Sequence, residues 1–484
     1  MTATNIEIAG LNGSLVELSS KQLEGLESRV EGRLLRAGGA GWDDAVRIWN
    51  GMVAKAPALA LQPTSAEDVA AAVGFARDHS LLLSIKGGGH NMAGTSIAER
   101  GLALDMSHIR GVTVDPDRRL AHVGPGCLLR DVDRATQAHG LATPLGSFSS
   151  EVGVAGLTLG GGLGYLTRRF GWSADNLEEV EIVTADGQIR TANRDDNSDL
   201  FWAVRGGGGN FGVVTRFTFR LHEVGPTITG GLIVWSAERT DDVLATYRDL
   251  TESAPRELTM LVNVRPAPPA PFLPDAWHGK PIIGILVCHS GQNARADLAP
   301  LFALGEPIAD LVTEKPYVDQ QSMLDGSEPK GQHYYWKTEY LAGLSNQFLD
   351  TFRDCALKVT SPLSGSLVIH LAGALNDLAD DDGAVGNRDA RYICAFAGQW
   401  PPGDNDDEHV AWVREGWKSV QPFSTGGNYL NFQTADEDEE RVRATYGTNF
   451  DRLVDVKEEY DPENMFRSNR NIRPRARARK AGPS

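Results

Sequence analysis

The sequence predicts an α+β fold in which a glycine-rich module is followed by a second α+β domain. Short β-rich runs alternate with helical patterns from Pro57 to about Glu223, and after Pro226 strand-like runs are separated by helical stretches or by the proline-rich loop 266–274. We therefore expect three segments, named by residue number: the glycine-rich module (1–224, with its core at 57–223), the sheet domain (225–426) and a C-terminal segment that returns to the module (427–484).

The individual elements follow from hydrophobic periodicity. In the glycine-rich module, helical spacing covers 66–79 and 128–139, and Ser65 is a typical N-cap for the first of these helices. Strand patterns in the module cover 81–85, 102–105, 121–123, 180–184 and 212–221, and those of the sheet domain cover 228–234, 258–264 and 282–288. In the C-terminal segment we expect a helical stretch over 439–460, followed by the turn Tyr460-Asp461-Pro462-Glu463.

Composition limits the classes of function. With 484 residues and 41% hydrophobic content, the chain is long enough for two or more domains with their own cores. A net charge of −17 opposes binding to nucleic acid or to anionic membranes. The four cysteines form no Cys-x-x-Cys pair, and residues 1–20 have no basic start followed by an apolar block. We expect a soluble, cytoplasmic protein without a disulfide framework or a membrane span.

The segment Ile85-Lys86-Gly87-Gly88-Gly89-His90-Asn91-Met92-Ala93-Gly94 joins a phosphate-binding backbone to a nucleophilic side chain. Three consecutive glycines let several backbone N–H groups converge on an anion such as a pyrophosphate. The buried strand before them places the turn at a sheet edge, where ligands commonly bind. His90 stands beside this site, where a neutral imidazole can attack an electrophilic ring carbon of a cofactor. The segment alone also allows a simple glycine-rich turn whose histidine hydrogen-bonds locally.

Two further glycine-rich segments follow, over 152–164 and 205–214. The second offers small residues and free backbone donors to an extended ligand. The third contains Gly207-x-Gly209-x-x-Gly212, the spacing of the dinucleotide fingerprint, but that fingerprint opens a helix, and the β-branched and aromatic run 213–219 predicts a strand. We therefore reject a Rossmann fold. No Walker-type Gly-Lys-Ser/Thr follows a glycine run, and no His-Glu-x-x-His or tight carboxylate cluster supports metal catalysis.

In their order, the three glycine segments resemble those of the covalent flavoproteins of the vanillyl-alcohol oxidase superfamily. The resemblance is strongest to the berberine-bridge-enzyme-like FAD-linked oxidases, including bacterial members of the 6-hydroxynicotine oxidase type, and it covers nearly the whole chain. It includes the motifs Gly41-Trp42-Asp43, Trp49-Asn50-Gly51-Met52, 199–207, 460–467 and Asn469-x-Asn471. It implies a two-part FAD-binding domain, formed by the glycine-rich module and the C-terminal segment, and an antiparallel-sheet substrate domain.

The resemblance also implies how FAD is held. His90 matches the histidine that carries the 8α-methyl of FAD, and the loop from Lys86 to Asn91 matches the part that holds the pyrophosphate. Many members add a thioether from a cysteine at the position of Ser149, so the resemblance implies a single covalent bond, through His90. The cofactor-binding residues expected on this basis are Lys86, Gly87, Gly88, Gly89, His90, Asn91, Gly94, Ser149, Val152, Gly153, Gly156, Gly160, Gly161, Gly164, Gly212, Val214, Asn469 and Asn471.

Val152 matches the position that gates oxygen in the plant members of the family. A valine there leaves room for dioxygen at the flavin, whereas a leucine is typical of dehydrogenases. The resemblance thus favours an oxidase that removes a hydride from an alcohol, sugar or amine C–H and reduces dioxygen to hydrogen peroxide. Two alternatives stay open: a dehydrogenase with a non-oxygen acceptor, and a flavin-binding protein with a structural flavin. The identity of the small-molecule substrate and the oligomeric state are not indicated by the sequence.

Two residues are candidates for the group that takes the proton of the substrate. The family motif Tyr-x-Asn-Tyr is here Tyr429-Leu430-Asn431-Phe432, so Tyr429 is a candidate to orient substrate or, with a lowered pKa, to act as base. His370 falls, by approximate alignment, where berberine-bridge-type enzymes place a catalytic carboxylate. Strand alternation puts it on one face with Ser366 and Val368, and we expect this face to look toward the flavin.

Each of these candidates has a structural alternative. Aromatic packing explains Tyr429 equally well, and a lone histidine on a strand is often a structural residue. The aromatic segment 334–340 is a candidate wall for a sugar, phenol or alkaloid ring, with core packing as its alternative.

Overall fold

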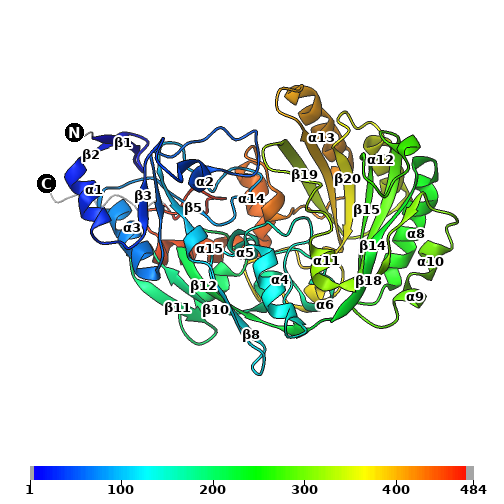
Figure 1. Cartoon of the computed structure of the whole chain (residues 1–484), viewed down its shortest axis with the longest axis horizontal. Coiled ribbons are helices and arrows are strands. Elements are labelled where there is room, and N and C mark those ends of the chain that lie inside the picture. Colours follow the sequence, from blue (N-terminus) through cyan, green and yellow to red (C-terminus); the bar gives the residue numbers. More distant parts are fainter. Residues whose placement is uncertain (1–4, 476–484) are drawn as a thin grey trace.

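The structure, a computed structural model, describes residues 5–475, so residues 1–4 of the N-terminal stretch considered above lie outside it. The α+β fold is confirmed. Figure 1 shows the glycine-rich module on the left and the sheet domain on the right, with α14 (Glu439–Tyr446) of the C-terminal segment between them. The two larger parts therefore meet along a seam to which the end of the chain returns.

Two sheets form the centre of the glycine-rich module. In the first, three strands are parallel and the edge strand β3 is antiparallel, in the order β3 (Arg33–Leu35), β4 (Leu59–Gln62), β6 (Leu102–Asp105), β5 (Leu83–Lys86). The second is antiparallel throughout, in the order β11 (Ile189–Asn193), β10 (Leu177–Val183), β12 (Val213–Arg220), β8 (Leu120–Val123), β7 (Val112–Asp115). Because β12 follows the third glycine segment, that segment opens a strand, as predicted, and the rejection of a Rossmann helix is confirmed.

Helix α3 (Ala66–Asp78) joins the two sheets of the module. Its N-cap is Ser65, as predicted, and the side chain of Ser65 accepts a hydrogen bond from the N–H of Asp68 (3.2 Å). Its buried side chains Val69 and Val73 share one core with residues of both sheets. The remaining elements of the module are β1 (Ile6–Ala9), β2 (Leu15–Leu18), α1 (Ser20–Glu27), α2 (Trp42–Val46), α4 (Leu129–Gln137), β9 (Leu141–Ala142), α5 (Val154–Leu159), α6 (Thr167–Phe170), α7 (Ser198–Val204) and β13 (His222–Glu223).

The sheet domain is built on one antiparallel sheet of eight strands. Their order is β17 (Ala309–Asp310), β14 (Thr227–Ser236), β16 (Pro281–His289), β15 (Leu258–Pro266), β20 (Gly365–His370), β21 (Tyr392–Trp400), β19 (His333–Leu341), and β18 (Thr313–Pro316) also pairs with β14. The helices of the domain are α8 (Thr240–Ser253), α9 (Ala294–Asp297), α10 (Ala299–Phe302), α11 (Tyr317–Gln321), α12 (Asn346–Ala356) and α13 (Asp406–Val420).

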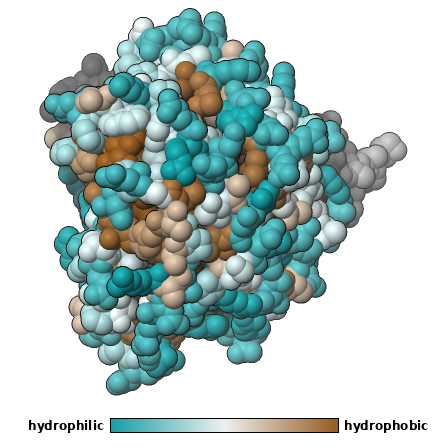
Figure 2. All heavy atoms as spheres, turned by 90° about the vertical axis from the view of Figure 1, so that its right-hand side faces the viewer, coloured by the Kyte–Doolittle hydropathy of each residue, from teal (hydrophilic) through white to brown (hydrophobic). Residues whose placement is uncertain are grey.

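The two faces of this sheet have different partners because successive side chains of a strand alternate between them. One face packs beneath α8, α12 and α13, and Val262, Val368 and Phe396 belong to this core. The opposite face turns toward the glycine-rich module, and its residues Leu261 and Ile369 share a core with Trp49. Figure 2 views the helix-covered end, where hydrophilic side chains surround apolar patches.

The C-terminal segment differs from the prediction of one helical stretch over 439–460. It forms two helices, α14 and α15 (Phe450–Tyr460), because Gly447 takes a φ of +55° and interrupts the regular backbone. Lys457 of α15 is fully buried, and its Nζ donates to Asp461 Oδ2 (2.7 Å), to the carbonyl of Asn210 (2.7 Å) and to the carbonyl of Phe466 (2.9 Å). These bonds tie the end of the chain to the third glycine segment.

No helix among residues 5–475 combines the length and the apolar character needed to cross a bilayer.

Candidate active site

One cavity lies where all three glycine segments meet the sheet domain and the C-terminal segment. The sheet domain contributes Trp336 and Glu328 to its wall, and the C-terminal segment contributes Tyr429 and Phe432. The predicted cofactor-binding residues that line it are Gly87, Gly88, Gly89, His90, Asn91, Val152, Gly153, Gly156, Gly160, Gly212, Val214 and Asn469. Residues from distant parts of the sequence thus form one continuous site.

The first two glycine segments touch each other through their backbones. A Cβ on Gly88 would lie 2.6 Å from the nitrogen of Gly153, and a Cβ on Gly153 would lie 2.3 Å from the nitrogen of Gly88. No larger residue fits at either position without separating the segments. Among the described residues, no acceptor takes a hydrogen bond from the N–H of Gly88, Gly89 or His90. This part of the wall is therefore bare backbone with donors available to an anion.

His90 lies on the cavity wall, and its ring is held by an aromatic stack. Its centroid lies 4.2 Å from that of Trp49, which in turn lies 3.6 Å from the ring of Tyr334. Burial lowers the pKa of His90 to about 4, and the positive charge of Lys330 contributes to this shift. The imidazole is therefore neutral near pH 7 and keeps a lone pair for an electrophile.

Tyr429 also lies on the wall, but its hydroxyl is committed to the second glycine segment. The phenolic oxygen accepts hydrogen bonds from the N–H groups of Gly162 (3.1 Å) and Leu163 (2.8 Å) and from Nδ2 of Asn431 (2.9 Å). Burial raises the pKa of Tyr429 to about 12, although these donors oppose the rise. The lowered pKa considered for a base is therefore wrong, and the contacts assign Tyr429 to positioning the second segment.

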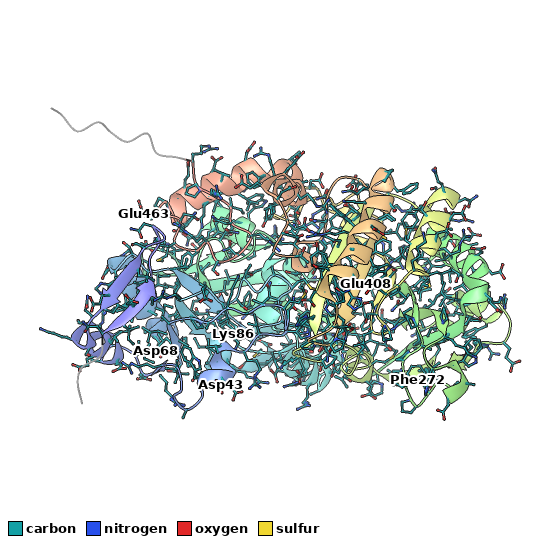
Figure 3. The ribbon with its side chains drawn as sticks, turned by 90° about the horizontal axis from the view of Figure 1, so that it is seen from above. Asp43, Asp68, Lys86, Phe272, Glu408 and Glu463 are labelled. Carbon is teal, nitrogen blue, oxygen red and sulfur yellow. The ribbon has the colours of Figure 1, made fainter. Side chains whose placement is uncertain are left out.

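Several predicted cofactor residues lie beside the cavity rather than on its wall: Lys86, Gly94, Ser149, Gly161, Gly164 and Asn471. Lys86 ends β5 inside the glycine-rich module (Figure 3), where its Nζ pairs with Asp105 (3.2 Å) and donates to the carbonyl of Asp44 (3.2 Å). Ser149 Oγ accepts a hydrogen bond from the N–H of Glu151 (3.2 Å). A Cβ on Gly164 would lie 1.3 Å from the carbonyl oxygen of Leu145, so packing requires this glycine.

The predicted orientation of His370 is wrong. Leu367 and Ile369 face the glycine-rich module, and His370 alternates with them onto the helix-covered face of the sheet. His370 is 1% exposed, its ring stacks on Tyr392 at 5.4 Å, and neither ring nitrogen has a hydrogen-bond partner among the described residues. Burial lowers its pKa to about 2, with help from the charges of Arg168 and Arg391. The residue packs behind the sheet and does not line the cavity.

Large aromatic side chains line another part of the cavity. Phe148, Trp336 and Phe432 contact one another, with centroid separations of 5.9, 5.8 and 5.1 Å. Of the predicted aromatic segment 334–340, Trp336 alone lines the cavity, and Lys337 and Glu339 form ion pairs with the C-terminal segment. Phe148 and Glu328 were not predicted as site residues, because they belong to no motif. Trp49 was not predicted either, although it belongs to the family motif Trp49-Asn50-Gly51-Met52.

Four buried side-chain atoms on residues of the cavity wall have no hydrogen-bond partner among the described residues. They are Ser96 Oγ, Trp336 Nε1, Gln433 Oε1 and Asn469 Oδ1. Buried polar atoms in native proteins are almost always paired. Residues of the cavity wall therefore carry both donors and acceptors without a partner in the described chain.

Known proteins match this arrangement in two segments of the chain. Residues 57–193 match the family described as FAD binding domain, and residues 428–473 match the family described as berberine and berberine like. These matches contain the first glycine segment with His90 and the C-terminal wall with Tyr429 and Asn469.

Relatives match over nearly the full length. The (R)-6-hydroxynicotine oxidase of Paenarthrobacter nicotinovorans is 30% identical and covers 92% of this chain and 97% of its own. An FAD-linked oxidoreductase of Dictyostelium discoideum is 27% identical over 92% of this chain and 95% of its own. The chain is therefore an FAD-dependent oxidoreductase. It belongs to the berberine-bridge-enzyme-like family of FAD-linked oxidoreductases, as the glycine segments predicted.

Solved structures share the fold. The 6-hydroxy-D-nicotine oxidase from Arthrobacter nicotinovorans has a TM-score of 0.80 and 26% identity, over 92% of this chain and 98% of its own. The berberine bridge enzyme from Eschscholzia californica has a TM-score of 0.83 at 19% identity, over 94% of this chain and 99% of its own. The fold thus persists where most side chains differ.

Proposed function

We propose that this oxidoreductase is an oxidase that carries FAD on His90, removes a hydride from a small alcohol, sugar or amine, and passes the electrons to dioxygen. The observation that carries the proposal is the cavity itself, which combines a bare glycine backbone, a neutral nucleophilic imidazole and an aromatic wall. FAD supplies, when bound, an acceptor for the two electrons of the substrate.

The residues of the cavity fit FAD. The free N–H groups of Gly88, Gly89 and His90 suit a pyrophosphate, since converging backbone donors bind anions. Gln433 and Asn469 of the cavity wall each carry a side-chain carbonyl oxygen without a partner among the described residues, and the N–H groups of a ligand suit such acceptors. A dinucleotide with both phosphate oxygens and ring N–H groups satisfies both sets.

The covalent attachment is proposed from the state of His90. Its neutral ring is the nucleophilic form, and the Trp49 stack limits its rotation. Ser149 has no thiol, so a second attachment at that position is chemically excluded and one bond per chain is expected.

The oxygen reactivity is proposed from Val152, which lies on the cavity wall. Its short side chain supports a route for dioxygen, and relatives named as oxidases, among them the (R)-6-hydroxynicotine oxidase, support the same choice. The aromatic wall formed by Phe148, Trp336 and Phe432 supports substrates with an apolar ring face, because aromatic rings pack well on one another.

Three measurements test this function. After denaturation in acid or SDS, yellow fluorescent flavin should stay with the polypeptide, and free release of all flavin would disprove the covalent bond. A screen of alcohols, sugars and amines should find substrates that release hydrogen peroxide. If the reduced flavin instead persists for minutes in air in stopped-flow experiments, the protein is a dehydrogenase.

A further inference from the structure

A loop of the sheet domain, residues 325–331, is fixed against the glycine-rich module beside Val152. The carboxylate of Asp325 accepts hydrogen bonds from the N–H (2.6 Å) and Oγ (2.7 Å) of Ser150. Lys330 forms an ion pair with Glu151 (2.9 Å). Both ends of the loop are therefore attached to the two residues that precede Val152 on the cavity wall.

The middle of the same loop is fixed to the aromatic stack that holds His90. Trp49 Nε1 donates to the carbonyl of Glu328 (2.9 Å), and the hydroxyl of Tyr334 donates to the carbonyl of Pro329 (2.7 Å). The N–H of Gly331 donates to the carbonyl of Trp49 (2.9 Å). The backbone of Glu328 is thus held at a defined place next to the proposed flavin attachment.

The side chain of Glu328 is left free by these contacts. Asp325 and Lys330 use their charged groups as anchors, whereas Glu328 forms no ion pair or side-chain hydrogen bond among the described residues. It lines the cavity, and among the described lining residues it is the only carboxyl group. An unpaired carboxyl on a fixed stretch of backbone at a cavity is available for chemistry rather than for stability.

The surroundings of Glu328 shift the pKa of its carboxyl group. Burial raises its pKa to about 8, and the charge of Arg265 on β15 opposes the rise in part. Arg265 Nη2 donates to the carbonyl of Leu363 (3.1 Å) and forms no ion pair among the described residues. The other ionisable neighbours are Tyr334, whose hydroxyl is already donating, Lys330, which is paired with Glu151, and the neutral His90.

The other ionisable side chains considered for acid–base chemistry are unavailable. The hydroxyl of Tyr429 already meets three donors, and His370 lies behind the sheet. His90 is assigned to the flavin, and Arg470 on the wall is a cation. Phe432 has no ionisable group.

We propose that Glu328 accepts the proton of the substrate during oxidation. The substrate C–H bond breaks and its electron pair leaves with the hydrogen as a hydride for the flavin. The O–H or N–H on the same carbon loses its proton to the Glu328 carboxylate, a C=O or C=N bond forms, and the carboxyl later releases the proton to water. This proposal rests on the proposed function only in that FAD accepts the electrons, and it does not depend on dioxygen.

The test compares the wild type with Glu328→Gln, which keeps the size of the side chain but cannot take a proton. Flavin reduction by a substrate is followed without oxygen in stopped flow, where the variant should be about 10²–10⁴-fold slower with unchanged flavin content. The wild-type rate should rise with pH through about 8, the pKa of Glu328, and the variant should lose this limb. Burial also raises the pKa of Asp133, to about 7, so difference infrared titration of the substrate-free protein should show a second carboxyl component near pH 8, and only that component should disappear in Glu328→Gln.

Two controls frame the result. Glu306→Gln removes an exposed carboxyl of the same type and should change neither the rate nor the band. Glu328→Asp keeps the carboxyl and should keep a pH-dependent rate. The proposal is overturned if Glu328→Gln reduces its flavin at the wild-type rate, or if Glu328→Gln removes no titrating carboxyl component from the wild-type spectrum. No step of this test uses oxygen. The role of Glu328 can therefore be confirmed or rejected even if the protein proves not to be an oxidase.

Discussion

The two walls of the cavity are built in different ways. On the side of the glycine-rich module the wall is backbone, and Gly88 and Gly153 approach so closely that neither tolerates a Cβ. The part of the wall that comes from the sheet domain and the C-terminal segment consists of large side chains, among them Trp336, Phe432 and Glu328. A backbone wall requires glycine at fixed positions, whereas a side-chain wall can be assembled from any residues that the fold brings together. The cofactor can therefore be predicted from the sequence, whereas the substrate cannot.

The largest expected effect on the backbone wall comes from His90→Ala, because this change removes the nucleophile itself. All covalently held flavin should be lost, measured as fluorescence retained by the denatured chain. Ser149→Ala is the matched control and should retain it, since Ser149 has no part in the bond. Flavin that stays on the chain in His90→Ala would contradict the assignment and would require another attachment residue.

The close approach of the two glycine segments gives the next effect. Gly88→Val places a side chain against the Gly153 nitrogen, which a Cβ alone would reach at 2.6 Å, and overpacking of this kind costs about 1–3 kcal/mol. We expect a lower unfolding midpoint and poor FAD loading. Gly156→Ala is the contrasting variant, because its Cβ meets no protein atom and yet faces the cavity. It should lower FAD loading without destabilising the apoprotein, and equal destabilisation by both variants would refute the comparison.

His370 provides an effect of similar size behind the side-chain wall. Its folded-state pKa of about 2 lies below the ordinary value of 6.5, so the unfolded chain binds a proton that the folded chain refuses. The free energy of unfolding is therefore unaffected by the protonation of His370 above pH 6.5 and decreases as the pH falls below that value. At pH 5 this decrease is about 2 kcal/mol. His370→Gln should flatten the fall in unfolding free energy between pH 7 and 5 in urea titrations, with kcat unchanged. A large loss of kcat at pH 7 in a folded variant would restore a catalytic role.

The smallest effect is expected at Trp336, on the side-chain wall. Trp336→Leu removes an aromatic contact worth about 0.5–1.5 kcal/mol to a ring-bearing substrate, so KM should rise modestly. Flavin content should not change, because Trp336 belongs to the aromatic part of the wall and not to the glycine backbone. A Trp336→Leu variant that lost its flavin would show that the side-chain wall also contributes to flavin binding.

Regular elements were predicted well where the hydrophobic period is uninterrupted. The helix expected over 66–79 is α3 (Ala66–Asp78), and the strand expected over 102–105 coincides with β6. The helical stretch expected over 439–460 failed as one helix because a single glycine, Gly447, adopts a positive φ, which periodicity does not reveal. Periodicity reports the face that a residue occupies rather than local backbone breaks.

The site was predictable only in part, for a related reason. Alternation grouped His370 correctly with Ser366 and Val368, but nothing in a single strand indicates which face meets a cavity. Glu328 belongs to no motif, and its position depends on a contact with Trp49, which lies 279 residues earlier in the sequence. Such a residue becomes visible only when long-range contacts are known.

The bonds of Lys457 bear on how the protein is made. They join the end of the chain to the third glycine segment, and the cavity wall extends from Trp49 to Arg470. During synthesis, His90 and the three glycine segments therefore leave the ribosome long before the C-terminal part of the cavity wall, so the growing chain cannot yet enclose a ligand. Flavin capture therefore belongs to the finished polypeptide, because a product truncated before Tyr429 has all the phosphate-binding glycines but lacks the C-terminal part of the cavity wall.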